Sequence, residues 1–151
     1  MGLNKNKTVV LALFFLIISV IPFTIIHEIG HSLVCLADGH EFHIDIQIFT
    51  SSSMICKGEI SHEPLFNAAG GVLATVVAIV VFVFLKRGFI VIPMASIAIS
   101  HMLNAIVEAG FYKSYVSADF WPAVFLFTDS IIFIGISSIY LRKQSNLLLK
   151  I

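Results

Sequence analysis

The sequence predicts a mainly α-helical, polytopic membrane protein with about four transmembrane helices and a small β-hairpin between the first and the second. Of the 151 residues, 58% are hydrophobic and 12% are charged. The mean hydropathy is +1.00, so lipid rather than water is the expected solvent for most of the surface. Four apolar segments each reach the roughly 20 residues that a helix needs to cross a bilayer. We expect one domain, residues 1–151.

The four predicted spans run from about 8 to 36, 65 to 85, 89 to 107 and 120 to 141. The first is longer than one crossing requires, so we expect it to tilt, to kink at Pro22 or to emerge from the membrane at its end. It is also too long for a cleaved signal peptide, and we interpret it as a retained helix. In the second span, Gly70 and Gly71 are expected to allow close packing against the first.

The polar stretch between the first two spans shows the alternation of a strand. Apolar residues at every second position, from Phe42 to Ile48, are separated by polar ones. A serine turn at 51–53 and a return strand over 54–60 complete a predicted hairpin at the membrane surface. Cys35 and Cys56 are too few for a disulfide framework. One bridge is possible outside the cytoplasm, and we interpret Cys35 as a small core residue.

Charge excludes one class of partner and suggests an orientation. The formal net charge is zero, so the chain lacks the excess of basic residues that is typical of nucleic-acid-binding proteins. The lipid bilayer is its expected surrounding. With four spans, most lysines and arginines fall on the side of the two termini. The positive-inside rule therefore predicts that both termini are cytoplasmic.

The chemistry of the chain is concentrated near the end of the first span. His27 and His31 are four residues apart, so on a helix they share one face. Two imidazoles at this spacing can bind one zinc ion, which lowers the pKa of a bound water to about 7 and polarises a carbonyl. Glu28 then lies beside the metal, as a general base and not as a ligand.

The location of this motif strengthens the metal interpretation. Each ionisable group near the bilayer centre costs on the order of 2.5–3.5 kcal/mol on insertion scales. Three such groups within five residues, at the end of an apolar run, need compensation that a metal ion can provide. The alternative is a polar cap where the helix leaves the membrane.

A zinc site needs a third protein ligand, and two candidates are unsuitable. Cys35 is two turns from His27, about 12 Å along a helix, which is too far to share one ion. Asp129 lies near the middle of the fourth span, deeper than the motif. We expect it to face the bundle interior with a polar partner.

Glu108, Asp119 and His101 remain as candidates. The third span should run outward and the fourth inward, which places Glu108 and Asp119 at the level of the motif and His101 deeper. Asp119 has an alternative role as the N-cap of the following helix, and the two roles are compatible.

The motif on a transmembrane helix, followed by a strand region, resembles the site-2 protease family of intramembrane metalloproteases. The segment from Asn67 to Gly71 is similar to the family's Ala-Gly-Pro segment, with Gly71 in place of proline. Asn104 followed by Asp119 is similar to the family's asparagine-then-aspartate pattern, with Phe120 where glycine is usual. The resemblance implies that Asp119 is the third zinc ligand and that Asn104 contacts the substrate backbone or the oxyanion. Asn104 has an alternative role in an interhelical hydrogen bond.

The sequence-based hypothesis is therefore a zinc metalloendopeptidase that cleaves membrane-embedded proteins or peptides, with Glu28 activating the water. The resemblance implies an active site open to the cytoplasm, whereas the basic residues place that end outside. One alternative is a catalytically silent adaptor or regulator with the same fold. The other is a metal transporter that uses histidines and acids as a relay.

Overall fold

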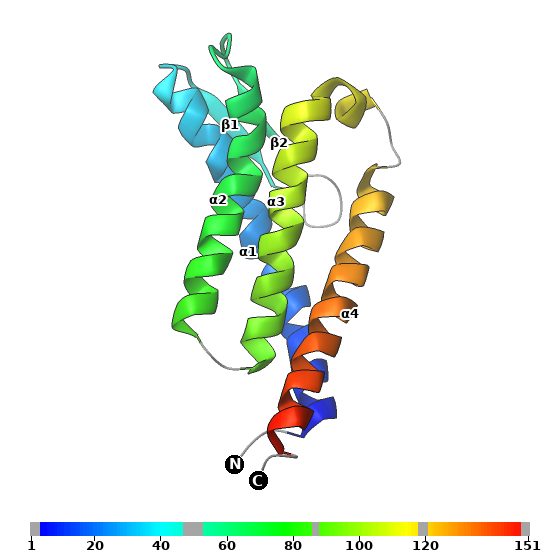
Figure 1. Ribbon diagram of the computed structural model, residues 1–151. Helices are drawn as coiled ribbons and strands as arrows, with labels where there is room; N and C mark the ends of the chain where they lie inside the picture. The colour runs from blue at the N-terminus through cyan, green and yellow to red at the C-terminus, as the bar shows by residue number, and fades with distance from the viewer. Residues whose placement is uncertain (1–3, 47–52, 86–87, 118–120, 149–151) are drawn as a thin grey trace.

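The computed structural model describes residues 4–46, 53–85, 88–117 and 121–148, and it confirms the predicted fold class (Figure 1). Within the described residues, four helices are long and apolar enough to cross a membrane, as in a multi-pass membrane protein. A two-stranded antiparallel hairpin lies between the first and second helices. The elements are α1 (Lys5–Ala37), β1 (Phe42–Asp45), β2 (Ser53–Cys56), α2 (Glu63–Phe84), α3 (Gly88–Ser117) and α4 (Trp121–Leu148).

Helix α1 is longer than one membrane crossing. It has 33 residues, and its N-cap residue Asn4 accepts a hydrogen bond from the Asn6 backbone N–H. At 1.5 Å per residue it measures about 50 Å, well over the roughly 30 Å of a hydrocarbon core. Pro22 lies inside the helix. The motif therefore lies near the far end of one continuous helix.

Helices α3 and α4 both continue beyond the apolar segments that predicted them. The third span was predicted to end near residue 107, but α3 runs to Ser117 and has non-helical backbone angles only at Phe111. Helix α4 ends at Leu148 instead of near residue 141. Apolar runs mark the lipid-facing length of a helix, and a helix can continue beyond that length; in α4 the continuation begins with Arg142, Lys143 and Gln144, which have good helix propensity. This extension keeps Glu108 within the helical part of α3.

The hairpin is shorter than predicted. Strands β1 and β2 pair antiparallel, with Phe42 opposite Cys56 and Ile44 opposite Met54. The predicted strand up to Ile48 and the serine turn include residues 47–52, which lie outside the described residues. The return strand ends at Cys56 instead of residue 60.

The hairpin is tied to the end of α1. Cys35 and Cys56 form a disulfide bond, so the expectation that Cys35 is only a small core residue was wrong. Cys35 is nevertheless fully buried. The backbone N–H of Ser61 also donates to the carboxylate of Asp38 at 2.8 Å. The disulfide joins the hairpin, and the hydrogen bond joins the segment that follows it, to the end of the helix that carries the motif.

Small residues let the three inner helices approach closely. A Cβ on Gly30 of α1 would meet the backbone carbonyl of Ala69 on α2. A Cβ on Gly71 would meet the backbone of His101 on α3, so Gly71 packs against α3 and not, as expected, against the first helix. Below these crossings, Ala74 and Ala78 pack with Phe23 in the core. Backbones at this separation bring polar side chains of different helices within bonding distance.

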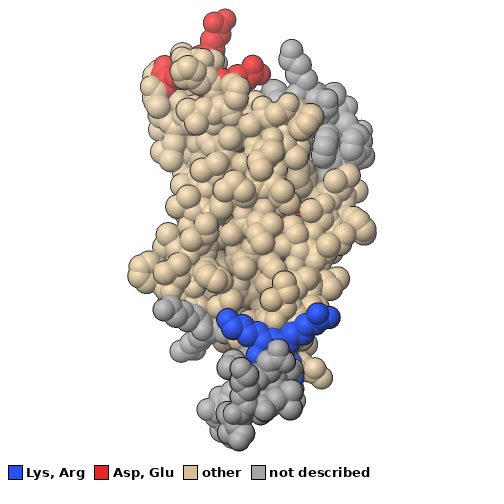
Figure 2. All heavy atoms as spheres, viewed as in Figure 1, with Lys and Arg blue, Asp and Glu red and all other residues tan. Residues whose placement is uncertain are grey.

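Apart from acidic residues inside the bundle, the described charged residues lie toward its two ends. Figure 2 shows lysine and arginine side chains at the end where α1 begins and acidic side chains at the opposite end, where the hairpin lies. Lys57 of the hairpin end is paired with Glu41 at 3.2 Å. The basic end contains Lys5, Lys7, Arg142 and Lys143, and the acidic end contains Asp38, Glu41, Glu59 and Glu63.

Candidate metal centre

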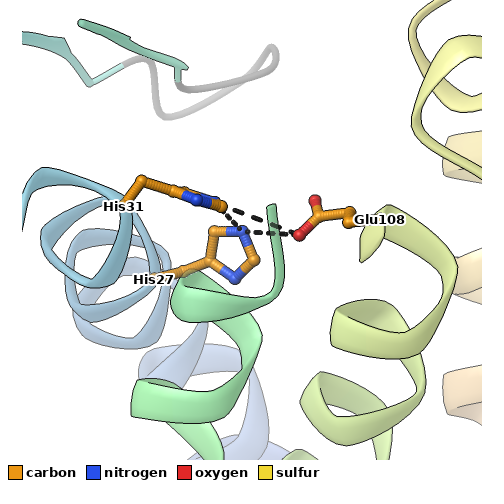
Figure 3. A group of neighbouring side chains, drawn as sticks. All are labelled: His27, His31 and Glu108. Atoms are coloured by element: carbon orange, nitrogen blue, oxygen red, sulfur yellow. Dashed lines mark hydrogen bonds and ion pairs between the residues drawn. The ribbon is translucent and has the colours of Figure 1, made fainter. Parts of the chain in front are cut away.

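His27 and His31 of α1 point toward one another, as their spacing of four predicted (Figure 3). Their ring centroids are 4.8 Å apart. The two Nε2 atoms are separated by 3.1 Å. Both side chains are nearly buried, with 11% and 12% of their surface exposed. The two nitrogens therefore face a common, largely enclosed point.

Helix α2 positions these two rings. The Nδ1 of His31 lies 2.6 Å from the backbone carbonyl oxygen of Phe66. Since a carbonyl only accepts, Nδ1 carries the proton in this contact, and the lone pair of a neutral ring is then on Nε2. Gly70 provides the space, because a Cβ there would lie 2.5 Å from Nε2 of His31 and 2.7 Å from Nε2 of His27.

Glu108 of α3 brings the third donor atom to this point. Its Oε2 lies 3.5 Å from Nε2 of His27 and 4.0 Å from Nε2 of His31. Two ligand atoms bound at about 2.0–2.1 Å to one tetrahedral ion would be about 3.3 Å apart. The three separations of 3.1, 3.5 and 4.0 Å are close to that spacing. The buried group of His27, His31 and Glu108 could therefore hold a metal ion.

The polar atoms of this group are not satisfied by the protein. Oε2 of Glu108 and Nδ1 of His27 are buried and have no hydrogen-bond partner within the described parts of the chain. A buried carboxylate oxygen without a donor is strongly unfavourable. A cation between the three side chains would satisfy Oε2, so the donor set fits a metal ion.

No protein-family model, curated protein or solved structure matches this chain. The functional argument therefore depends on the chemistry of the site itself.

Glu28 lies next to the first histidine and is also buried, with 7% of its surface exposed. It is close enough to His27 and Glu108 to interact electrostatically with both. Glu28 is not one of the three converging donors. A second carboxyl group is therefore held beside the candidate metal centre without being part of it.

Two polar residues continue the site down α3. Asn104 is one turn before Glu108, and its Oδ1 is buried with no hydrogen-bond partner among the residues described. The interhelical hydrogen bond considered as an alternative role for Asn104 is thus not made through this oxygen. The ring of His101 lies 5.6 Å from that of His27. It is deeper than the metal centre, as expected.

The remaining candidates are placed elsewhere. Asp119, the predicted third ligand, lies outside the described residues, and that prediction stays untested. Asp129 has a side-chain hydrogen bond with Ser100 of α3, which is the polar partner expected for it. A signal for Glu108 was present in the sequence, because the polar residues at 101, 104 and 108 recur at the spacing of one helix face.

Proposed function

We propose that this protein is an intramembrane zinc metalloprotease that hydrolyses peptide bonds of membrane-embedded substrates. The observation that carries the proposal is the convergence of His27 and His31 from α1 with Glu108 from α3, while Glu28 is held beside them. Two histidines and one carboxylate are a common donor set of catalytic zinc sites, which keep a fourth position open.

The three donors would hold the zinc ion, with Glu108 taking the place that the sequence offered first to Asp119. Zinc supplies Lewis-acid polarisation of the scissile carbonyl and acidifies water. Glu28 accepts the proton of the attacking water and then donates it to the leaving amine. Glu28 suits this role because its carboxyl is near the donors and is not used by them.

Asn104 would bind the substrate backbone. Its buried Oδ1 lacks a donor among the described residues, and a backbone N–H of an unwound substrate can provide one. An unsatisfied buried acceptor costs about 1–3 kcal/mol, which substrate binding would recover.

The hairpin offers a surface for the unwound segment. Within the described chain, β1 pairs with β2 alone, so its other edge can accept an added strand. Ile46 follows β1 and is 44% exposed. We expect Ile46→Pro, which removes a backbone donor, to cripple cleavage, while Ile46→Val leaves cleavage intact. Equal cleavage by both variants would overturn strand addition.

The site would face away from the cytoplasm. The basic residues lie at the opposite end of the bundle, which the positive-inside rule places in the cytoplasm. The Cys35–Cys56 disulfide lies at the end that carries the site, and disulfides persist in oxidising compartments. Both observations favour this orientation over the cytoplasmic one that the family resemblance implies.

The proposal is tested by zinc content and by one substitution. The protein purified in detergent should contain one zinc ion, and Glu28→Gln should retain that zinc but lose cleavage of membrane proteins in cells. Glu63→Gln, at the exposed start of α2, is the matched control and should cleave normally. Absence of zinc, or equal cleavage by wild type and Glu28→Gln, would refute the protease proposal and favour the alternative of a catalytically silent adaptor.

A metal transporter is a second candidate, favoured by the position of His101 and Asp129 below the metal centre. These groups lie among mainly apolar side chains, which poorly replace the hydration of an ion. Zinc flux into liposomes that contain the protein would distinguish this function. The protease proposal predicts no flux above that of empty liposomes.

A further inference from the structure

A cavity of about 660 Å³ lies between α1, α3 and α4, next to the metal centre. Most of its walls are aliphatic or aromatic. Wall residues such as Val20 and Leu126 are also exposed on the outer surface, so the cavity opens sideways toward the lipid. Its polar groups include the hydroxyl of Ser100, the ring of His101 and the carboxyl of Asp129.

The carboxyl of Asp129 lies level with the middle of the candidate span in α3. It is hydrogen-bonded to Ser100, the central residue of the Phe89–Phe111 span. A carboxyl group has up to four acceptor positions, and one hydroxyl supplies a single donor. Among the described residues, no lysine or arginine lines the cavity, and His101 is the only other ionisable residue in its wall. The site thus has an acidic group without a basic partner of its own.

We propose that this cavity is the docking site for a transmembrane segment that carries a basic side chain at mid-depth, with Asp129 as its counter-charge. Ionisable residues within membranes commonly pair with one another, and a basic side chain is the partner that would stabilise the ionised form of an acid at this depth. A lipid acyl chain would fill the space but has no donor at this depth, since its polar head lies at the interface.

The cavity is large enough for the contacting face of a helix. A helix about 10 Å in diameter occupies roughly 120 Å³ per residue. The cavity therefore accommodates the equivalent of five to six residues, about one and a half turns. The occupant would bind along α4, which lies beside α3 in Figure 1.

The docking site sets a distance to the scissile bond, on the premise that the proposed protease function is correct. His101 lines the cavity, and its ring is 5.6 Å from that of His27. From Ser100 to Glu108, α3 rises about 12 Å. That length corresponds to about eight residues of a helical substrate or about four of an extended one. Cleavage is therefore expected four to eight residues from the basic residue, toward the hairpin end.

Capture of a probe tests the docking site without requiring catalysis. The Glu28→Gln protein, in lipid nanodiscs, would carry a photo-cross-linking residue in place of Leu126. The probe is a single-span peptide of leucine and alanine with one central lysine. One control peptide has leucine at that position, and another has the lysine moved by seven residues. We expect about tenfold more cross-linking with the central lysine than with either control.

Variants of the acidic group provide the second arm. Asp129→Asn should abolish the preference for the central lysine, and Asp129→Glu should retain it. Ser100→Ala, a milder change, should reduce the preference several-fold, and elution of each variant as a single peak in size-exclusion chromatography reports whether it is folded. Equal capture of the lysine and leucine peptides, an unchanged preference in Asp129→Asn, or cross-links to lipid alone would overturn the proposal.

The two proposals fail separately. If capture depends on Asp129 but the wild-type chain cleaves nothing, the docking site stands and the protease proposal fails. If membrane proteins are cleaved regardless of a mid-span basic residue and of Asp129, the docking proposal fails and the protease stands.

Discussion

At the scale of single residues, the site depends on two buried carboxyl groups with different surroundings. The Oε2 of Glu108 lies within 4.0 Å of both histidine Nε2 atoms. Glu28 lies close to His27 but is not part of the converging group. In the proposed mechanism, Glu108 binds the metal ion and Glu28 transfers the proton.

The first prediction concerns the third ligand. Glu108→Ala removes one of three protein donors and should lower zinc affinity by more than the roughly 10–100-fold seen when only a supporting residue is lost. Competition with a chelator of known affinity measures the change. Asp119→Ala is the control and should bind zinc normally. Loss of zinc from Asp119→Ala, with full binding by Glu108→Ala, would transfer the role to Asp119.

The second prediction concerns the space beside the histidines. In Gly70→Ala, the new Cβ would lie 2.5 Å from Nε2 of His31 and displace both rings, so zinc binding should be largely lost. Gly110→Ala is the matched control because a Cβ there meets nothing within 4 Å. Equal zinc content in the two variants would show that the rings tolerate the added methyl group.

At the scale of elements, the hairpin and α1 act as one unit. The disulfide closes a loop of 21 residues between the end of α1 and β2, and the Ser61–Asp38 hydrogen bond adds a second link. The turn of α1 that carries His31 is one turn from Cys35. Anchoring of the hairpin therefore also anchors the end of the motif helix.

The third prediction follows from this link. Reduction of the disulfide should lower the stability of the detergent-solubilised protein by about 3 kcal/mol, the value expected for a loop of this size. Unfolding in increasing SDS, with and without a reductant, measures the shift. The Cys35→Ser, Cys56→Ser double variant should be as stable as the reduced protein, and the reductant should not change its stability. A reductant effect of equal size in that variant would rule out the disulfide as its cause.

At the scale of the whole molecule, charge and disulfide together define the two ends. The hairpin end carries most of the exposed acidic residues, the disulfide and the metal centre. The other end carries the start of α1, the end of α4 and most of the described basic side chains. A single orientation accounts for the positive-inside bias and for the oxidised cysteines.

The fourth prediction is the orientation itself. In intact cells, a membrane-impermeant maleimide should label Ser61→Cys, near the hairpin, and should not label Lys143→Cys, near the end of α4. After the cells are opened, both should be labelled. The native cysteines do not interfere because they are paired. Labelling of Lys143→Cys alone in intact cells would reverse the orientation.

The sequence by itself determined the fold class and two of the three donors of the candidate metal centre. Apolar length predicts spans because lipid requires it, and the spacing of His27 and His31 places both on one face because the helical repeat is local. Only the tertiary structure decided that Glu108 joins them, that Cys35 pairs with Cys56, and that Gly71 faces α3. These contacts join residues far apart in the chain, and their distances depend on how closely the helices cross and at what depth. Spacing along the sequence does not contain that information.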